Sequence, residues 1–390
     1  MFLKKMLERN PDFLSTVLDM LGDGRIEPDT YAIDVDSLMV NATLLLAEGN
    51  EHGVELFFMT KQFGRNPRIA RMLMEAGYPG AVAVDFREAT HLMENGVRVM
   101  HAGHLVQIPQ ALIPLMVGSV RYITVFSVQK ACAIGKAALA AGEVQDVFLR
   151  FIGKTDCIFP GQQGGFALET LDEIVPQLVQ IEGIRIAGLT SFPCFAFDEG
   201  HFETTANVRT MVRAREAIEQ RWSLPVTHLN MPSATCLETI PMIAASGGTQ
   251  GEPGHALTGY TPKEAVETTP LMPAIVYATE VSHSFTDADG RAVSCLFGGG
   301  YYRRGHVRGA CIRVGKSLEI ARVIPPDPVF IDYYFDVKGT FPAGSPAVMA
   351  FRTQVFATRS RVALVEGMKT GTPRVTGVYD SQGRLLEDRR

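Results

Sequence analysis

The sequence predicts an α/β fold in which a TIM-type (β/α)8 barrel is followed by a mostly antiparallel β domain. From residue 54, short apolar strands alternate with helical patterns, which is typical of parallel βαβ units. After residue 260, β-rich segments follow one another without a helical pattern between them. The length of 390 residues fits a large barrel plus a smaller module.

Composition and charge exclude several classes of protein. Apolar residues make up 46% of the chain and charged residues 20%, which argues against disorder. The net charge is −5 and the densest internal basic pair is Arg303-Arg304, so nothing favours binding to nucleic acid or to a membrane surface. We find no apolar run of the roughly 20 residues that a membrane span needs, and no signal peptide at the N-terminus. Six scattered cysteines without a C-x-x-C pair argue against disulfides and structural zinc, and favour a cytoplasmic location.

Residues 1–30 are expected to form an N-terminal helical segment. Asn10 is a candidate cap, Pro11 suits the first helical position, and Gly22 ends the pattern. The segment 31–35 has the pattern of a strand, and we expect it to join the β domain.

The predicted barrel covers residues 36–260. The expected strands are 55–60, 81–84, 98–102, 122–126, 146–151, 185–191, 227–231 and 249–252. Helix signals lie between them; for example, Asn66-Pro67 begins a helical pattern that Gly77 ends. A doubly wound open sheet is the rival architecture, and the count of eight strands favours the barrel.

Residues 261–390 are predicted to form the C-terminal β domain. Asp289-Gly290 is a good hairpin turn between two of its strands. The expected strands are 274–285, 292–297, 310–314, 347–357 and 361–366.

In a barrel, active sites lie at the carboxyl ends of the strands. The first predicted strand runs directly into Lys61, and partial desolvation at a barrel mouth lowers the pKa of an amine, as a Schiff-base lysine requires. A surface lysine in a loop is the commoner fate of any lysine, and Lys154 is a rival after the fifth strand.

Two further strand ends carry groups that suit a phosphate. Asn230 and Ser233 follow the seventh strand, and Glu252, Gly254 and His255 follow the eighth. Hydroxyls and backbone amides there can surround a phosphate, and barrels often bind one after the last two strands. Each motif alone is better explained by a helix cap or a tight turn. Together with a strand-end lysine, they predict a pyridoxal phosphate site.

The sequence also resembles the alanine-racemase-like, fold-type III pyridoxal-phosphate enzymes along almost its whole length, and within them the YhfX-type branch. The motifs that carry the resemblance are residues 59–67 (MTKQFGRNP), 102–109 (AGHLVQIP), 188–193 (GLTSFP), 230–235 (NMPSAT), 252–259 (EPGHALTG) and 298–306 (GGGYYRRGH). The set is specific, although no single motif is.

The resemblance implies roles for individual residues. Lys61 would form the imine with the cofactor, and Arg65 stands where alanine racemases keep a phosphate-binding tyrosine. Asn230, Ser233 and the amides of Gly254 and His255 would line the phosphate site. Glu252 replaces the arginine of alanine racemases, as in the ornithine-decarboxylase-like members, and a carboxylate there would stabilise a protonated pyridine ring.

Several positions depart from the pattern of the family. Ser191 stands where many relatives have a histidine against the ring, so His104 is an alternative contact. Gln163 matches an arginine that contacts the ring hydroxyl in alanine racemase. Thr353 and its neighbours offer no histidine or cysteine where the metal-dependent members bind a divalent ion, so we expect no catalytic metal.

Racemisation needs a second base, which alanine racemase takes from the partner subunit. Tyr302 is the preferred residue here, with Tyr301, His306 and His283 as alternatives. Arg303 or Arg304, together with His306, would bind the substrate carboxylate. A strand with a glycine bulge and solvated arginines is an equally good reading of this run.

The resulting hypothesis is a cytoplasmic pyridoxal-phosphate-dependent amino-acid racemase or epimerase, an isomerase that works as a homodimer with shared active sites. A decarboxylase or lyase on the same scaffold is the first alternative, because Glu252 permits each reaction. A non-catalytic carrier of the cofactor is the second, and the extra β domain argues against it.

Overall fold

The structure is a computed structural model that describes residues 1–299, 305, 307–327 and 329–389. The chain forms two compact units. The sheet unit consists of Met1–Ala42, Lys61–Asn66 and His255–Arg390, and the barrel unit of Thr43–Thr60 and Pro67–Gly254.

The barrel unit contains a nine-stranded parallel sheet that nearly closes on itself. The strands are β2 (Glu55–Leu56), β3 (Phe58–Met59), β4 (Ala81–Val82), β5 (Val99–Ala102), β6 (Val120–Val125), β7 (Gln145–Leu149), β10 (Ile184–Thr190), β13 (His228–Asn230) and β14 (Gln250–Gly251). Strand β2 pairs with β14 while β3 pairs with β4, and only Phe57 separates β2 from β3. The sheet therefore begins and ends on one stretch of chain, which confirms the predicted TIM-like barrel over the open sheet.

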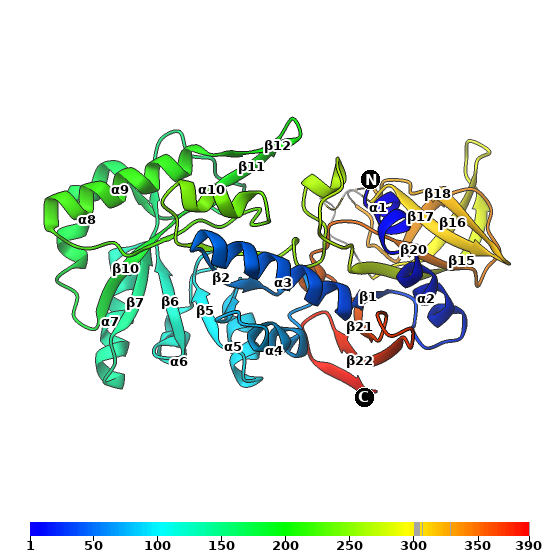
Figure 1. The fold of residues 1–390 in the computed structure, drawn as a ribbon, viewed down its shortest axis with the longest axis horizontal. Helices are drawn as coiled ribbons and strands as arrows, with labels where there is room; N and C mark the ends of the chain where they lie inside the picture. The colour runs from blue at the N-terminus through cyan, green and yellow to red at the C-terminus, as the bar shows by residue number, and fades with distance from the viewer. Residues whose placement is uncertain (300–304, 306, 328, 390) are drawn as a thin grey trace. The chain divides into compact units, whose positions relative to one another are not determined.

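Helices follow the strands of this unit, as the alternating pattern predicts (Figure 1). They are α3 (Val35–His52), which begins in the sheet unit, α4 (Pro67–Glu75), α5 (Phe86–Glu94), α6 (Ile113–Met116), α7 (Val128–Ala141), α8 (Leu171–Leu178), α9 (Ala206–Trp222) and α10 (Thr239–Ala245). Local chemistry sets their ends. The Asp85 carboxylate caps α5 by accepting from the backbone N–H of Glu88, and the Ser127 hydroxyl does the same at α7.

The barrel interior is filled by side chains from alternate strand positions. Phe57, Tyr122 and Phe148 belong to one buried cluster, in which the Tyr122 and Phe148 rings stack at 4.4 Å. Gly188 of β10 lies so close to β13 that a Cβ would come within 2.3 Å of the His228 carbonyl oxygen. The barrel is thus a packed core rather than a pore.

Two short two-stranded sheets lie in loops of this unit. One pairs β8 (Phe151–Ile152) with β9 (Phe166–Ala167). The other is a hairpin of β11 (Phe195–Asp198) and β12 (His201–Thr204). The sequence patterns predict neither.

The sheet unit is built on a ten-stranded, mostly antiparallel sheet, as predicted. Its strands are β1 (Thr30–Asp34), β15 (Ile275–Thr286), β16 (Ala292–Phe297), β17 (Gly309–Val314), β18 (Ser317–Arg322), β19 (Tyr334–Lys338), β20 (Pro346–Met349), β21 (Arg361–Glu366), β22 (Arg374–Asp380) and β23 (Leu385–Asp388). Strand β1, buried at all five positions, pairs antiparallel with β15 and parallel with β21. The N-terminal strand is therefore an inner strand of a sheet built mainly from the C-terminal third.

Some expectations for this unit are wrong in detail. The strand expected over 347–357 is only β20, followed by a 3-10 turn at Val355–Ala357. The N-terminal helix α2 (Pro11–Gly22) forms as predicted, but another helix, α1 (Phe2–Arg9), precedes it. The Asn10 side chain does not cap α2, because its amide donates to Asp34 and to the Pro273 carbonyl instead.

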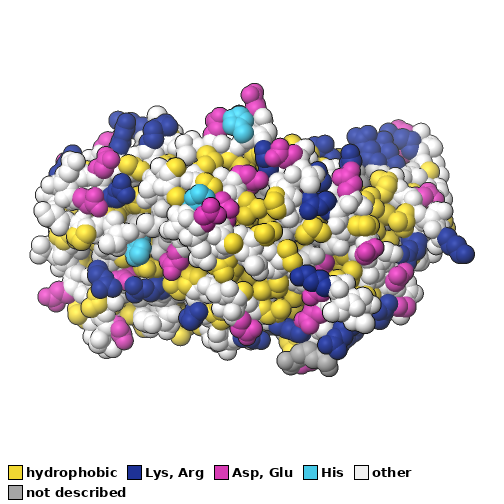
Figure 2. Space-filling model, in the orientation of Figure 1, with side chains coloured by type: hydrophobic (Ala, Val, Ile, Leu, Met, Phe, Trp, Pro, Cys, Tyr) yellow, Lys and Arg dark blue, Asp and Glu magenta, His cyan; other side chains and the backbone are white. Residues whose placement is uncertain are grey.

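Acidic and basic side chains are interspersed on the face shown in Figure 2, in keeping with the small net charge. None of the helices in the described residues combines the length and the hydropathy of a membrane-spanning helix.

Candidate active site

A buried carboxylate, Glu252, is the centre of a hydrogen-bond network at the carboxyl ends of the barrel strands. It follows β14 directly and is 5% exposed. Its Oε1 atom lies 2.8 Å from Nδ1 of His101 and accepts a bond of 3.1 Å from the Asn230 amide. Its backbone N–H donates to the Thr235 hydroxyl at 2.9 Å.

The pKa of Glu252 is lowered by its surroundings. Burial alone would raise the pKa, but the hydrogen bond from His101, the positive potential of His101 and His104, and the Asn230 amide outweigh burial. The side chain is therefore a carboxylate at neutral pH. Its Oε2 atom receives no hydrogen bond from any residue that the structure describes, so one oxygen of a fixed carboxylate remains available.

The same network reaches two further strands. Asn230, the last residue of β13, accepts a bond of 2.7 Å from the hydroxyl of Thr190 at the end of β10. The Thr190 hydroxyl also lies 3.5 Å from Nδ1 of His104. The His101 ring is held on its other side by Thr124 of β6, at 2.6 Å from Nε2. The predicted residues His104, Asn230 and Glu252 are thus brought together, whereas His101, Thr124 and Thr190 were missed.

A second buried carboxylate fixes the end of the first strand. Glu88, 0% exposed at the start of α5, accepts from the Thr60 hydroxyl and, at 2.8 Å, from the backbone N–H of Val84. Thr60 is the residue before Lys61. The residue before the candidate lysine is therefore fixed by a hydrogen bond to the barrel helix α5.

The loop after β13 has an unusual backbone. Ser233 and Ala234 have positive φ values of 97° and 49°. The Ser233 hydroxyl both donates to the carbonyl and accepts from the N–H of Phe195, at 2.8 and 3.1 Å. Because both functions of this hydroxyl are used, Ser233 acts here as an anchor for the start of β11. Successive backbone amides in such a loop are the groups that suit an anion.

Ser191 stands at the position where many relatives have a ring-stacking histidine, and its hydroxyl is hydrogen-bonded within the protein. It is buried directly after β10, and its hydroxyl accepts from the Asn207 amide at 3.3 Å. The neighbouring Phe192 ring packs edge-on against His104 at 5.7 Å.

In the sheet unit, Lys61 begins a short 3-10 helix, η1 (Lys61–Phe63), and His255 lies near it. Nε2 of His255 is 3.1 Å from the Thr353 carbonyl, which can only accept, so Nε2 carries the proton. Nδ1 then accepts from Arg352 at 3.3 Å. Burial, Arg352 and Lys61 hold the pKa of His255 well below its ordinary value. His255 is therefore a neutral imidazole beside two cations.

Arg65 belongs to the same unit, and its guanidinium has two partners there. The Arg65 backbone has a positive φ of 53°, and the residue is 4% exposed. It donates to the Gln382 side chain at 2.7 Å and lies 4.9 Å from the centre of the Phe356 ring. Lys61, Arg65 and Arg352 make this part of the sheet unit strongly cationic, which suits a phosphate or a carboxylate.

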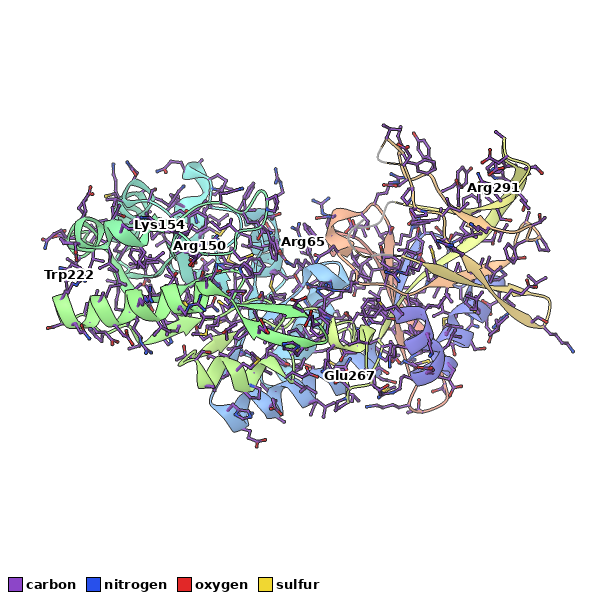
Figure 3. All side chains as sticks on the ribbon, turned by 90° about the horizontal axis from the view of Figure 1, so that it is seen from above. Arg65, Arg150, Lys154, Trp222, Glu267 and Arg291 are labelled. Carbon is purple, nitrogen blue, oxygen red and sulfur yellow. The ribbon has the colours of Figure 1, made fainter. Side chains whose placement is uncertain are left out.

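Other candidates are placed at the surface or outside the described residues. Lys154, the rival lysine, is 85% exposed at its side chain and pairs with Glu169 (Figure 3). Gln163 is exposed, whereas Arg150, which no motif singled out, is buried. His283 is exposed and packs on Tyr334. Tyr302, Arg303 and His306, with Tyr301 and Arg304, lie outside the described residues.

Each unit offers groups that fit a part of pyridoxal phosphate by their chemistry. In the barrel unit, Glu252 offers an anionic oxygen for a protonated ring nitrogen, and the Ser233-Ala234 backbone offers amides for a phosphate. In the sheet unit, Lys61 offers an amine for an aldehyde, and Arg65 offers positive charge for a phosphate. In the described part of the chain, no cluster of three or more His, Cys, Asp or Glu side chains is arranged to hold a metal ion.

Comparisons with known proteins agree with this chemistry. Residues 33–262 match the family model described as alanine racemase, N-terminal domain, and residues 276–375 match the YhfX-like C-terminal domain. The chain is 40% identical to the protein YhfX of Escherichia coli K12 over 391 residues, covering 99% of this chain and 100% of that protein.

Solved structures share the fold at low sequence identity. A D-threonine aldolase from Filomicrobium marinum matches with a TM-score of 0.65 at 14% identity, over 92% of this chain and 96% of its own. Alanine racemase of Clostridium difficile 630 matches with 0.65 at 14%, over 91% and 98%. D-threo-3-hydroxyaspartate dehydratase from Delftia sp. HT23 matches with 0.64 at 16%, over 90% and 97%. These proteins catalyse different reactions, so the shared fold does not select one.

Proposed function

Because the chain belongs to the pyridoxal-phosphate-dependent alanine racemase family, with a YhfX-like C-terminal domain, we propose that it is an amino-acid racemase or epimerase. The observation that carries this proposal is the environment of Glu252. It is a buried carboxylate with a lowered pKa, fixed through Oε1 and available at Oε2. Such a group holds a proton on the ring nitrogen of the cofactor.

When bound, the cofactor withdraws electrons from Cα of an amino acid and so makes its proton acidic. Oε2 of Glu252 would hold the protonated ring nitrogen, and His101 and Asn230 keep the carboxylate in place. Lys61 would hold the cofactor through its aldehyde, and its amine would be the base that moves the Cα proton on one face. In the barrel unit, Asn230, Ser233 and Gly254 would hold the phosphate, and His104 and Ser191 would hold the ring. In the sheet unit, Arg65 and His255 would serve the phosphate.

Inversion also needs a proton donor on the other face of Cα. We assign this role to Tyr302 of the partner in a cytoplasmic homodimer with shared sites, with Arg303 and His306 next to the substrate.

A decarboxylase or lyase is the second candidate, and the same observation favours it. A carboxylate rather than a guanidinium at the ring nitrogen strengthens electron withdrawal, which also promotes loss of carbon dioxide or of a leaving group. The family relation alone does not separate the three reactions.

The deciding experiment incubates cofactor-loaded protein with each amino acid in D₂O. Deuterium at Cα with inversion, read by mass spectrometry and chiral chromatography, supports the racemase. Carbon dioxide release identifies a decarboxylase, and ammonia release a lyase. A loaded protein that exchanges no Cα proton with any amino acid would contradict the proposal and leave a carrier of the cofactor. The Lys61→Ala variant is the control.

A further inference from the structure

A small hairpin of the barrel unit has no assigned role. Strands β11 and β12 pair with each other and are joined by a two-residue turn, Glu199-Gly200, whose φ values of 46° and 91° are both positive. None of the other strands in the described residues pairs with them, and the hairpin projects from the barrel unit (Figure 1). A two-stranded hairpin is barely stable alone, so its contacts with the rest of the protein hold it in place.

The two faces of the hairpin differ in chemistry. Because side chains alternate along a strand, Phe195, Phe197 and Phe202 share one face, on which Phe195 and Phe202 are buried. Phe197 lies directly opposite Phe202, and the centres of the two rings are 5.0 Å apart in an edge-on contact. The opposite face, which includes Asp198 and His201, is exposed. The aromatic face is therefore the one that holds the hairpin to the protein.

The base of the hairpin is fastened to the loop after β13. The Ser233 hydroxyl donates to the Phe195 carbonyl at 2.8 Å and accepts from the Phe195 N–H at 3.1 Å. The Cys194 N–H donates to the Pro232 carbonyl at 3.1 Å, and the Thr205 N–H donates to the Cys194 carbonyl at 2.9 Å. Both ends of the hairpin are thus joined at the loop that contains Ser233.

This loop has a backbone conformation that most residues disfavour. Its φ values are 97° at Ser233 and 49° at Ala234, and such a backbone persists only where its surroundings fix it. Beyond the hairpin, the Thr239 hydroxyl donates to the Ala234 carbonyl and the Glu252 N–H donates to the Thr235 hydroxyl, each at 2.9 Å. The hairpin, helix α10 and the Glu252 backbone therefore hold the loop together.

We propose that the β11–β12 hairpin is a positioning element of the phosphate site, and that the Phe197–Phe202 pair is the contact on which this role depends. The hairpin keeps Phe195 where its backbone holds the Ser233 hydroxyl, and the loop so held presents its amides to a phosphate. By linkage, a phosphate bound to those amides stabilises the hairpin in return. The inference rests on the part of the proposed function that places the phosphate at Ser233, and not on the reaction.

The test compares cofactor-free protein with protein loaded with pyridoxal phosphate. Hydrogen exchange of peptides covering the hairpin is read by mass spectrometry, and an apparent Kd for pyridoxal phosphate is measured from visible absorbance. Phe197→Ser removes the ring pair, whereas Phe197→Tyr keeps it, and Phe197 is only half-buried, so a tyrosine hydroxyl reaches solvent. His201→Ser is the matched control, because His201 lies on the exposed face of the same hairpin.

We expect the cofactor to slow exchange of the hairpin amides in the wild type, because binding stabilises the fastened hairpin. Phe197→Ser should lose this protection and bind pyridoxal phosphate roughly five- to fiftyfold more weakly, within the range typical of coupled sites. Phe197→Tyr and His201→Ser should behave as the wild type.

Three results would overturn the proposal. One is hairpin exchange in the wild type that does not respond to the cofactor, and another is an unchanged Kd in Phe197→Ser. The third is weaker binding by Phe197→Ser together with faster exchange in β6 and β7, because that result defines a general structural role. A loaded protein that exchanges no Cα proton contradicts the proposed reaction instead, while its hairpin exchange and its Kd still report on the positioning role.

Discussion

Nδ1 of His101 lies 2.8 Å from Oε1 of Glu252, and both side chains are shielded from solvent. The two residues come from β5 and from the segment after β14, 151 positions apart in the chain. This pair, supported by Asn230 and Thr124, keeps a carboxylate ionised inside the barrel, and several measurable properties depend on it.

Replacing Glu252 with Gln should change how stability depends on pH. The folded-state pKa of Glu252 lies below its ordinary value of 4.5, so its contribution is complete above about pH 4.5 and is lost as the pH falls through the folded-state pKa. The difference in unfolding free energy between wild type and Glu252→Gln should therefore shrink as the pH falls from about 4.5 to about 3, measured by urea titration. A difference that is constant over this range would contradict the lowered pKa.

Lys61→Ala should abolish the visible absorbance of the bound cofactor and the adduct that borohydride traps, because no other amine takes its place. Lys154→Ala is the matched control and should behave as the wild type, since that side chain is exposed and paired with Glu169. Peptide mass spectrometry of the reduced protein locates the adduct. An adduct at Lys154 would show that the assignment to Lys61 is wrong.

Glu88→Ala should destabilise the protein by about 1–3 kcal/mol, because it leaves the Thr60 hydroxyl and the Val84 N–H buried without their acceptor. Glu94→Ala in the same helix should stay within roughly 0.5 kcal/mol, since Glu94 is exposed. Urea unfolding measures both. Equal losses for the two variants would mean that the tie between Glu88 and the end of the first strand contributes little.

His255→Asn should flatten the acid side of the stability profile. The folded protein keeps His255 neutral well below the ordinary pKa of 6.5, whereas the unfolded chain takes up a proton there. Stability is therefore lost as the pH falls below about 6.5, by up to about 1.4 kcal/mol per pH unit for one proton. The His255→Asn variant lacks this pH-dependent contribution to the unfolding free energy. The unfolding free energies of both proteins at a series of pH values between about 7 and about 5 measure the contribution. Identical slopes of stability against pH for the two proteins would contradict the prediction.

Much of the barrel could be predicted because its strands are short apolar runs bounded by clear helix signals. The residues that end those strands were harder to rank. Arg150 lies near the end of the fifth predicted strand, 146–151, and Lys154 follows that strand, yet Lys154 is exposed and Arg150 is buried. Burial of a single charged side chain depends on loops distant in sequence, here those of Gln162 and Phe192, and spacing does not report it.

The sheet unit was predicted less completely for a related reason. Strand β18 exposes five of its six residues, so it has no alternating apolar pattern to detect.

In the barrel unit, His101 was also missed, although it belongs to a predicted strand. Its role follows from contacts with Thr124 and Glu252 across the barrel, and only closure of the sheet brings those three residues together.

The placement of β1 between β15 and β21 has a consequence for synthesis of the protein on the ribosome. Residues 30–34 emerge first, but both of their neighbours lie beyond residue 274. Chains fold progressively from the N-terminus as they emerge. The barrel segments can therefore assemble before the two strands that pair with β1 have been synthesised. Nascent chains stalled before residue 275 should therefore leave the Thr30–Asp34 stretch open to proteases and chaperones, and completing translation should bury it.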